Sequence, residues 1–277
     1  MSVRKLSAKA AGARPQIEVG NPAGSVSVEC IEGADALDVQ VEALNDAAEE
    51  LLDEVAIEAT EGDPDGRASR VRLRITVPER RLWENPEFSV RITTPPGADA
   101  RIAVASADVD LRGRFGDVTV TGASGDLAVE EASEVELRSA SGDVRVGTVH
   151  GAAYVRSASA DVRIGRVGGA LRVRGGSGNV TVEHAADAVI STASGDVTVV
   201  SATGETVQVR TASGDVSVGV PPGLRVWLEL HSVSGRITSH LDDDIDDTGD
   251  ARPDLTLNLE SVSGDLLIGR AAPAAVA

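Results

Sequence analysis

A recurring motif, S-x-S-G-D-V-x-V, constrains the fold of this chain more than any other feature of its sequence. If each unit is taken to end at the second Ser of S-x-S, the units end at Ser124, Ser141, Ser159, Ser177, Ser194, Ser213, Ser234 and Ser263. Counted from Ala107, the units are 18, 17, 18, 18, 17, 19, 21 and 29 residues long. A near-constant period of this size predicts a solenoid, in which each unit is one coil that contacts only its neighbours.

Each unit contains two short segments in which apolar and polar residues alternate, as in strands with one buried face. The first set of inward pairs is Val109/Leu111, Leu127/Val129, Val144/Val146, Val162/Ile164, Val180/Val182, Val197/Val199, Val216/Val218 and Leu266/Ile268. The second set is Val118/Val120, Val135/Leu137, Ala153/Val155, Leu171/Val173, Ala188/Ile190, Val207/Val209, Leu228/Leu230 and Leu257/Leu259. Because every position is apolar, we expect an all-β parallel β-solenoid of about eight two-stranded coils, with strands about 4.8 Å apart.

The turn that follows S-x-S is almost constant. It recurs as Gly125-Asp126, Gly142-Asp143, Gly178-Asn179, Gly195-Asp196, Gly214-Asp215 and Gly264-Asp265. Gly permits a positive φ, and Asp or Asn caps the turn with its side chain. Ala107 and Ala160 replace the Gly in two units, so a positive φ is not required in every coil.

Four segments follow from these patterns. We expect a flexible N-terminus at 1–14, a β-rich cap at 15–106, the solenoid at 107–269 and a flexible tail at 270–277. Within the cap, periodicity predicts strands at 26–31, 36–41, 70–77 and 88–93, and a short helix near 46–53. The phrase Pro95-Pro96-Gly97 marks a boundary, and Pro221-Pro222-Gly223 repeats it just before an Asp-rich insertion at 241–254.

Charge and composition limit the partners. The net charge of −18, with fourteen carboxylates and no Lys or Arg between Glu29 and Asp65, argues against nucleic acid. No stretch approaches the roughly 18 apolar residues of a membrane span, so we expect no direct membrane insertion. The basic N-terminus is followed by no apolar signal region, which predicts a cytoplasmic protein, with the cell surface by a non-Sec route as the alternative. The single cysteine, Cys30, is expected to be a structural thiol.

Stacked coils would align charged residues in rows. The turn residues Asp126, Asp143, Asp161, Asn179, Asp196 and Asp215 form one row, for which we favour turn capping over calcium binding. A second row contains Arg138, Arg156, Arg174 and Arg210, each five residues before a turn Asp or Asn. These arginines are expected to pair with those residues across the turn, and an anion-binding strip is the alternative.

No set of residues has the spacing of a catalytic, cofactor or metal site. His150, His184, His231 and His240 lack the H-x-H and H-E-x-x-H spacings and are expected in turns or expanded coils. Trp83 and Trp227 are expected to cover ends of the core rather than to bind sugar. We therefore predict no catalytic residue, no cofactor and no metal ligand, and hence no enzyme. A carbohydrate-active enzyme would need carboxylates clustered in a groove.

The run Pro95-Pro96-Gly97-x4-Ile102, followed by the reiterated S-x-S-G-D-V-x-V, resembles the bacterial putative-adhesin family of β-solenoid domains, also described as toast-rack domains. The segment Gly24-Ser-Val-Ser-Val is similar to the opening strand of that family. The resemblance covers nearly the whole chain. It implies a non-enzymatic domain that is sometimes attached to membrane or envelope-stress proteins.

The sequence thus predicts a non-catalytic scaffold or protein-interaction module, whose long regular faces bind a protein partner or associate with a second copy. A surface or glycan-binding adhesin is the alternative, as is an accessory domain related to envelope stress. If the chain has a site, we expect it where the repeat breaks, at 221–254 or in the acidic cap.

Overall fold

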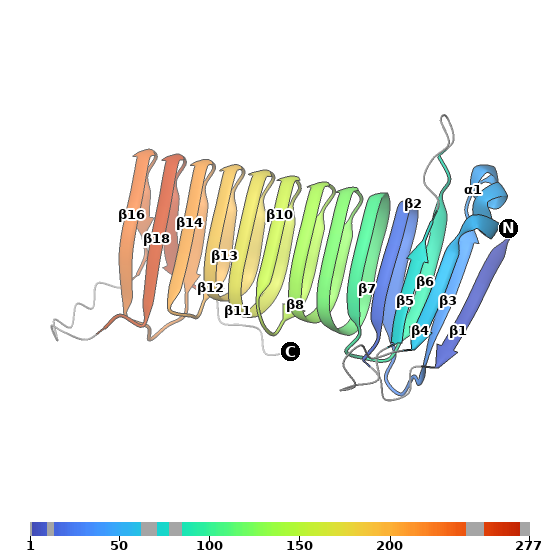
Figure 1. Ribbon diagram of the computed structural model, residues 1–277. Coiled ribbons are helices and arrows are strands. Elements are labelled where there is room, and N and C mark those ends of the chain that lie inside the picture. The colour runs from blue at the N-terminus through green and yellow to red at the C-terminus, as the bar shows by residue number, and fades with distance from the viewer. Residues whose placement is uncertain (1, 10–13, 62–70, 78–84, 242–251, 272–277) are drawn as a thin grey trace. The chain divides into compact units, whose positions relative to one another are not determined.

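The computed structural model describes residues 2–9, 14–61, 71–77, 85–241 and 252–271. It confirms an all-β solenoid, in which short strands stack in coils (Figure 1). The chain forms two compact units, Met1–Gly147 and Thr148–Ala277. Within the described residues, no helix has the length and apolar character needed to cross a membrane.

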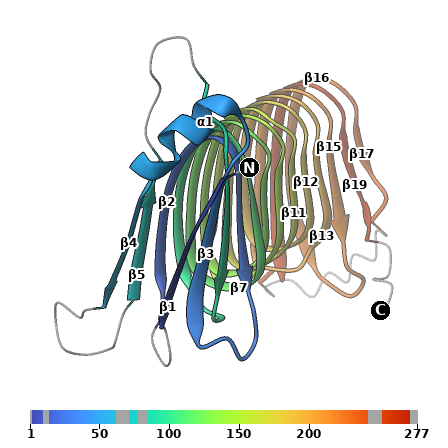
Figure 2. The same ribbon diagram turned by 90° about the vertical axis from the view of Figure 1, so that its right-hand side faces the viewer.

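The first unit begins with irregular elements and continues into regular coils (Figure 2). Its elements are β1 (Val3–Lys9), β2 (Gln16–Cys30), β3 (Ala36–Ala43), α1 (Asp46–Leu51), a 3-10 turn (Leu52–Glu54), β4 (Ala56–Glu61), β5 (Val71–Thr76), β6 (Phe88–Thr94), β7 (Asp99–Ser124) and β8 (Leu127–Ser141). Strand β9 (Val144–Val149) follows and crosses the boundary between the units. Asn45 caps α1 by accepting a hydrogen bond from the Ala48 N–H at 2.9 Å.

The spatial order of the coils in the first unit differs from their order in the sequence. Strand β2 lies between β6 and β7, pairing in parallel with both, although β6 directly precedes β7 in the chain. The first residues of β2 likewise lie between β5 and β7. Three antiparallel pairings, β3 with β6, β1 with β3 and β4 with β5, complete this part of the unit.

The second unit contains only strands among its described residues. They are β10 (Ala153–Ser159), β11 (Val162–Ser177), β12 (Val180–Ser194), β13 (Val197–Ala202), β14 (Thr206–Ser213), β15 (Val216–Val220), β16 (Val226–Ser234), β17 (Ile237–Ser239), β18 (Leu255–Ser263) and β19 (Leu266–Arg270). These strands pair in parallel and in register, so equivalent residues of successive repeats lie side by side.

The last coils of this unit also exchange places. Strand β18 pairs with β14 on one side and with β16 on the other. Strand β19 lies in the same way between β15 and β17. The coil formed by β18 and β19 comes last in the sequence, but it is the second-to-last coil in space, and β16 is drawn beyond β18 in Figure 1.

The two Pro-Pro-Gly phrases mark the places where the chain passes over a coil. Pro95-Pro96-Gly97 joins β6 to β7 past β2, and Pro221-Pro222-Gly223 joins β15 to β16 past the coil of β18 and β19. Gly97 and Gly223 have φ values of +80° and +85°. Pro followed by a Gly with positive φ is the residue order of a type II turn. This turn redirects the chain so that it spans ~10 Å, two strand spacings, instead of one.

The core consists of the inward positions that the repeat defines. Every residue of the two predicted sets is buried except Leu228 and Leu230, which are half-buried. These side chains are mostly Val, Leu and Ile, whose branched shapes suit the narrow space between two sheets. The exceptions both lie on β16.

The turn glycines have two separate roles. Gly142, Gly178, Gly195, Gly214 and Gly264 have positive φ, as predicted, whereas Gly125 does not. A Cβ on Gly125 would instead collide with the carbonyl of Ala107 in the preceding turn. The turns therefore need Gly because neighbouring coils approach closely there, even where the backbone conformation does not demand it.

The predicted strands and helix of the cap correspond to β2, β3, β5, β6 and α1, with bounds that differ by one or two residues, except that β2 begins earlier, at Gln16. The N-terminus differs from its expected flexibility, because Val3–Lys9 form a strand whose seven residues pair with β3. The predicted boundary at 106/107 falls inside β7, because β2 of the cap is itself a coil that pairs along β7. Of the tail at 270–277, residues 272–277 lie outside the described residues, as do residues 242–251 of the Asp-rich insertion.

Candidate interaction surface at the end coil

The coil formed by β16 and β17, residues 226–239, ends the stack of the second unit, and we refer to it as the end coil. Among the described residues, β16 pairs only with β18 and β17 pairs only with β19. One edge of each strand is therefore without a strand partner in the part of the chain that the structure describes. Such an edge presents unpaired backbone N–H and C=O groups and can pair with another chain.

The end coil also exposes apolar side chains. Trp227 is 63% exposed and Val233 is 69% exposed, the highest values among large hydrophobic side chains of the described residues. Ile237, at an inward position of the second sheet, is 44% exposed. Leu228 and Leu230 are half-buried, because no further coil of the described residues lies over them. Exposed apolar surface next to an open strand edge marks an interaction site.

Arg225 and Asp254 fix the position of the end coil. The Asp254 carboxylate accepts hydrogen bonds from the Arg225 backbone N–H at 3.0 Å and from its guanidinium Nε and Nη2 at 3.1 and 3.0 Å. These bonds hold the pKa of Asp254 below its usual value. Arg225 directly precedes β16 and Asp254 directly precedes β18, so this contact holds the first residues of the two strands side by side.

The turn of the end coil differs from the other turns. In the sequence Ser234-Gly235-Arg236, an Arg stands where the repeat has Asp or Asn. The Arg236 N–H donates to Asp265 Oδ1 at 2.7 Å. Arg236 carries no carboxylate or amide oxygen to accept from a further turn, so the end coil closes the row of turn residues.

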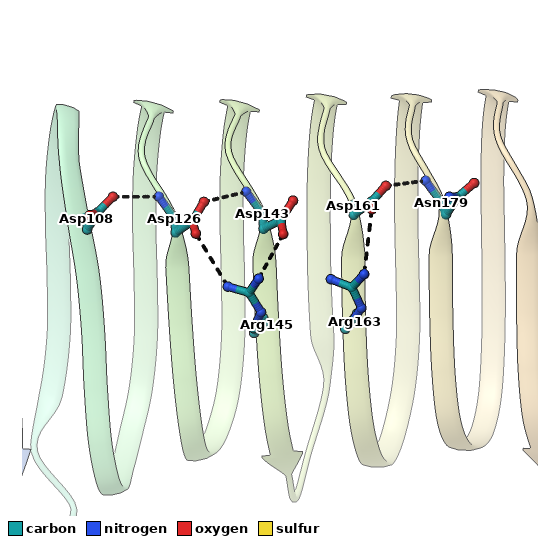
Figure 3. A network of polar contacts seen from close by, with 7 residues as sticks. All are labelled: Asp108, Asp126, Asp143, Arg145, Asp161, Arg163 and Asn179. Carbon is teal, nitrogen blue, oxygen red and sulfur yellow. Dashed lines mark hydrogen bonds and ion pairs between the residues drawn. The ribbon is translucent and has the colours of Figure 1, made fainter.

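That row is a ladder of side-chain to backbone hydrogen bonds (Figure 3). In the first unit, the Asp126 N–H donates to Asp108 Oδ1 at 3.0 Å, and the Asp143 N–H donates to Asp126 Oδ1 at 2.9 Å. In the second unit the same bond links Asp161, Asn179, Asp196, Asp215 and Asp265 in turn, at 2.8–2.9 Å. Each oxygen thus caps the turn of the next coil, which is the role favoured from the sequence.

The ladder has arginine partners other than the predicted ones. Arg145 binds Asp143 at 2.8 Å and Asp126 at 3.4 Å, and Arg163 lies 3.7 Å from Asp161 (Figure 3). Residues two apart on a strand project from the same face, and this places these arginines beside the turn carboxylates. Calcium binding was the less favoured interpretation of this row, and it stays untested. Within the described residues, no three or more His, Cys, Asp or Glu side chains are grouped as metal ligands.

The predicted cross-turn pairing of the other arginine row was wrong at two positions. Arg138 binds Glu136 at 2.6 Å, and Arg210 binds Glu260 at 3.1 Å. Their partners lie on the same sheet face, because a side chain reaches a neighbour on its own face more easily than one around the turn. Arg156 and Arg174 are stacked as direct neighbours on β10 and β11 and are exposed, so the anion-binding alternative stays a prediction there.

A polar groove of about 470 Å³ lies on the first unit, where β2, β5 and β7 run side by side. It contains Glu18, Asp99 and Asp117, the clustered carboxylates that a carbohydrate-active enzyme would need. Glu18 binds Arg74 at 2.8 Å, and Asp99 binds Arg14 at 2.6 Å and accepts a backbone hydrogen bond from Asp117. All three carboxylates thus form ion pairs with arginines, because Asp117 also lies 3.8 Å from Arg14.

The Toastrack DUF4097 family matches residues 16–272. The chain belongs to the Toastrack family. This membership confirms the toast-rack resemblance drawn from the Pro-Pro-Gly phrase and the repeat. No curated protein matches the chain.

The chain is similar to several solved structures at low sequence identity. One, described as a putative lipid binding protein from Parabacteroides distasonis, is 12% identical, with 96% of each chain covered and a TM-score of 0.50. Two described as putative adhesins, from Parabacteroides distasonis and Bacteroides fragilis, are 11% and 12% identical, with 97% of each chain covered and TM-scores of 0.37 and 0.36. At such identities the likeness concerns the fold alone.

The end coil of this Toastrack domain is where sequence reasoning was incomplete. Leu228 and Leu230 were assigned to the buried set because their strand repeats the inward pattern. Trp227 was expected to cover the core, but its side chain points outward, because it alternates with the inward Leu228 along β16. Trp83 lies outside the described residues. The substitution of Arg236 for the turn Asp was the sequence signal that this coil ends the stack.

The histidines lie apart from one another in the chain and on different elements. His184 lies in β12 and His231 in β16, whereas His150 and His240 lie outside the strands. The expectation that all four lie in turns or expanded coils was therefore wrong for His184, which is half-buried within a regular strand. It follows the buried Val180 and Val182 along β12, at the point where the strand approaches a corner of the coil, and it lies beside Ser201 of the next coil.

Proposed function

We propose that this Toastrack domain is a non-catalytic interaction module that binds a partner chain through its end coil. The observation that carries the proposal is the combination of an open strand edge with exposed Trp227 and Val233. Strand addition would supply main-chain hydrogen bonds from the edge, and the exposed side chains would supply specificity. A surface or glycan-binding adhesin and an envelope-stress accessory domain remain the alternative functions. The cytoplasmic location remains an expectation, with the cell surface as its alternative.

A single substitution can block pairing at the open edge of β16 without changing the rest of the fold. The Arg225 carbonyl accepts a hydrogen bond from the Leu255 N–H, so Arg225 directs its backbone toward β18. Because successive residues of a strand direct their backbone groups to opposite sides, Leu230 directs its N–H to the open edge. Leu230→Pro therefore removes an edge donor and leaves the pairing with β18 in place, since proline is tolerated on edge strands.

The proposal is tested with the full chain immobilised as wild type, Leu230→Pro and Val189→Asp. Val189 is 39% exposed on the outward face of β12, which makes it a matched control away from the end coil. We expect at least one protein from native cell extract to be retained by the wild type and the control but lost with Leu230→Pro. The same discrimination must then appear with that protein purified. Retention that is equal for all three chains would overturn the proposal.

A further inference from the structure

We infer that the end coil binds a second copy of this chain, through an antiparallel pair of β16 strands centred on Leu230. This inference rests on the proposed function and names its partner. It follows from three properties of the end coil: the way in which the turn ladder ends, the direction of the edge backbone groups, and the order of side chains along β16.

The end of the turn ladder argues against adding another parallel coil. Each regular coil offers an Asp or Asn oxygen to the backbone N–H of the next turn, as Asp215 does for Asp265 at 2.8 Å. The end coil has Arg236 at this position and offers no such oxygen. A parallel continuation would leave its turn N–H uncapped. An antiparallel partner does not place its turn beside Arg236 and needs no cap from it.

Two identical strands related by a twofold axis pair antiparallel, with each position meeting its counterpart across the axis. In β16 the backbone groups that reach the edge belong to Leu228, Leu230 and Ser232, by the alternation that starts at Arg225. With the axis at Leu230, the two copies of Leu230 exchange both N–H···O=C bonds. Leu228 then meets Ser232 of the second copy, and every edge group in this stretch gains a partner.

The outward side chains of β16 favour a twofold axis at Leu230 over an axis at the residue before or after it. With the axis at Leu230, Glu229 lies opposite His231 of the second copy, so that a carboxylate faces an imidazole donor. Trp227 lies opposite Val233 of the second copy, which brings together the two most exposed large hydrophobic residues. An axis at Glu229 would place two carboxylates opposite each other, and an axis at His231 would place two imidazoles opposite each other.

The same axis covers the inward side chains. It runs perpendicular to the sheets, so β17 of one copy meets β17 of the other in the second sheet. Leu228, Leu230 and Ile237, which are half-buried or exposed in one chain, then enter a core shared by the two copies. Every large apolar side chain of the end coil thus becomes less exposed to water, and this burial of apolar surface is the driving force expected for association.

The oligomeric state is the first test, measured on the full chain by sedimentation velocity across a concentration series. We expect the wild type to form a dimer of 28.4 kDa chains. Val233→Asp should weaken dimerisation by about tenfold or more, because it places a carboxylate opposite the indole of Trp227. Val233 is exposed, so this change leaves the fold of a single chain intact. The control Val189→Asp should dimerise as the wild type does.

Cysteine pairing tests the register. Glu229→Cys and His231→Cys chains are mixed under mild oxidation, and disulfide-linked dimers are identified by mass. Opposite residues of an antiparallel pair lie within disulfide reach, at about 4.5 Å between Cα atoms. The proposed register predicts disulfides between the two variants in the mixture and none with either variant alone. The native Cys30 is a weak competitor, because burial raises its pKa to about 12.

Three different outcomes would contradict the proposed register, the second copy as the partner, and the end coil as the interaction surface. A disulfide in Glu229→Cys alone, or in His231→Cys alone, would overturn the register. A chain that stays monomeric at all concentrations, yet loses a different purified partner on Leu230→Pro, would overturn self-pairing and leave the proposed function standing. A dimer that persists in both Leu230→Pro and Val233→Asp would overturn the end coil as the interaction surface.

Discussion

At the scale of the residue, the turn Asp owes its recurrence to backbone capping. Within each unit, the Asp or Asn of one coil accepts a hydrogen bond from the turn N–H of the next coil, so the group that matters is one oxygen and not the charge. Asn179 shows this directly, because its Oδ1 accepts from the Asp196 N–H at 2.9 Å, the same distance at which Asp196 accepts from Asp215. The carboxylates that remain are balanced by arginines such as Arg145.

This role predicts different effects for two substitutions of Asp196. Asp196→Ala removes the acceptor for the Asp215 N–H and should lower the free energy of unfolding by about 1 kcal/mol. Asp196→Asn keeps the acceptor and should stay within about 0.5 kcal/mol of the wild type. Urea denaturation followed by circular dichroism would measure both. Equal losses for Ala and Asn would show that the charge is required instead.

Cys30 is a second residue whose environment determines its chemistry. Burial removes solvent from its thiol and raises its pKa to about 12, while a backbone hydrogen bond involving Ala98 and the charge of Arg114 oppose the rise. The thiol therefore stays protonated well above neutral pH. This fits the structural role expected from the sequence.

We predict slow alkylation of Cys30 in the folded chain. At pH 8, iodoacetamide should modify it on the order of 10²–10³ times more slowly than in the urea-unfolded chain, because only the thiolate reacts. The rate should rise with pH through the alkaline range, since more thiolate forms as pH approaches the raised pKa. Mass spectrometry of timed samples would follow the reaction, and comparable rates in the two states would contradict the assigned burial.

At the scale of the element, Gly has different functions in the two kinds of turn. Gly223, in the phrase that passes over a coil, has a φ of +85°, but no atom lies within 4 Å of the position that a Cβ would occupy. Gly214, in the regular turn, has a φ of +137°, and a Cβ there would collide with the carbonyl of Gly195. The first position requires only a backbone conformation, whereas the second also requires space.

Replacing each of these glycines by Ala should separate the two requirements. Gly223→Ala should lower the free energy of unfolding by about 1–2 kcal/mol, the cost of a left-handed conformation for a residue with a Cβ. Gly214→Ala should cost more, because its coil must also move away from the preceding coil, where the carbonyl of Gly195 lies. Thermal and urea unfolding of the two variants would rank them. A smaller loss of unfolding free energy for Gly214→Ala than for Gly223→Ala would mean that the stacked turns can move apart at little cost.

At the scale of the whole molecule, each of the two units contains coils whose spatial order departs from sequence order. Strand β2 is inserted between β6 and β7, and the coil of β18 and β19 is inserted between two coils that precede it in the chain. The inserted coils make contacts on both sides. The end coil, in contrast, is held to the stack only through β18 and β19 among the described strands.

Truncation should reveal this dependence. A chain ending at residue 239 lacks β18 and β19, and its residues 226–239 should exchange amide hydrogens rapidly, because the strands that pair with them are gone. A chain ending at residue 220 should keep the protection of β12 and β13. Hydrogen exchange with mass spectrometry would compare the two. Protection of residues 226–239 in the longer truncation would show that β16 can pair directly with β14.

The sequence by itself determined the coil, the buried pairs and the turn chemistry, because period-2 alternation and a constant repeat length are local properties that every coil satisfies in the same way. It also indicated that the repeat breaks after Pro221. Only the tertiary structure decided which coil lies next to which, because β16 and β18 carry the same inward Leu pattern, so the pattern alone does not say which of them lies beside β14. That choice leaves Leu228 and Leu230 half-buried and Trp227 at an open edge. The candidate surface is therefore a consequence of coil order, which no local pattern encodes.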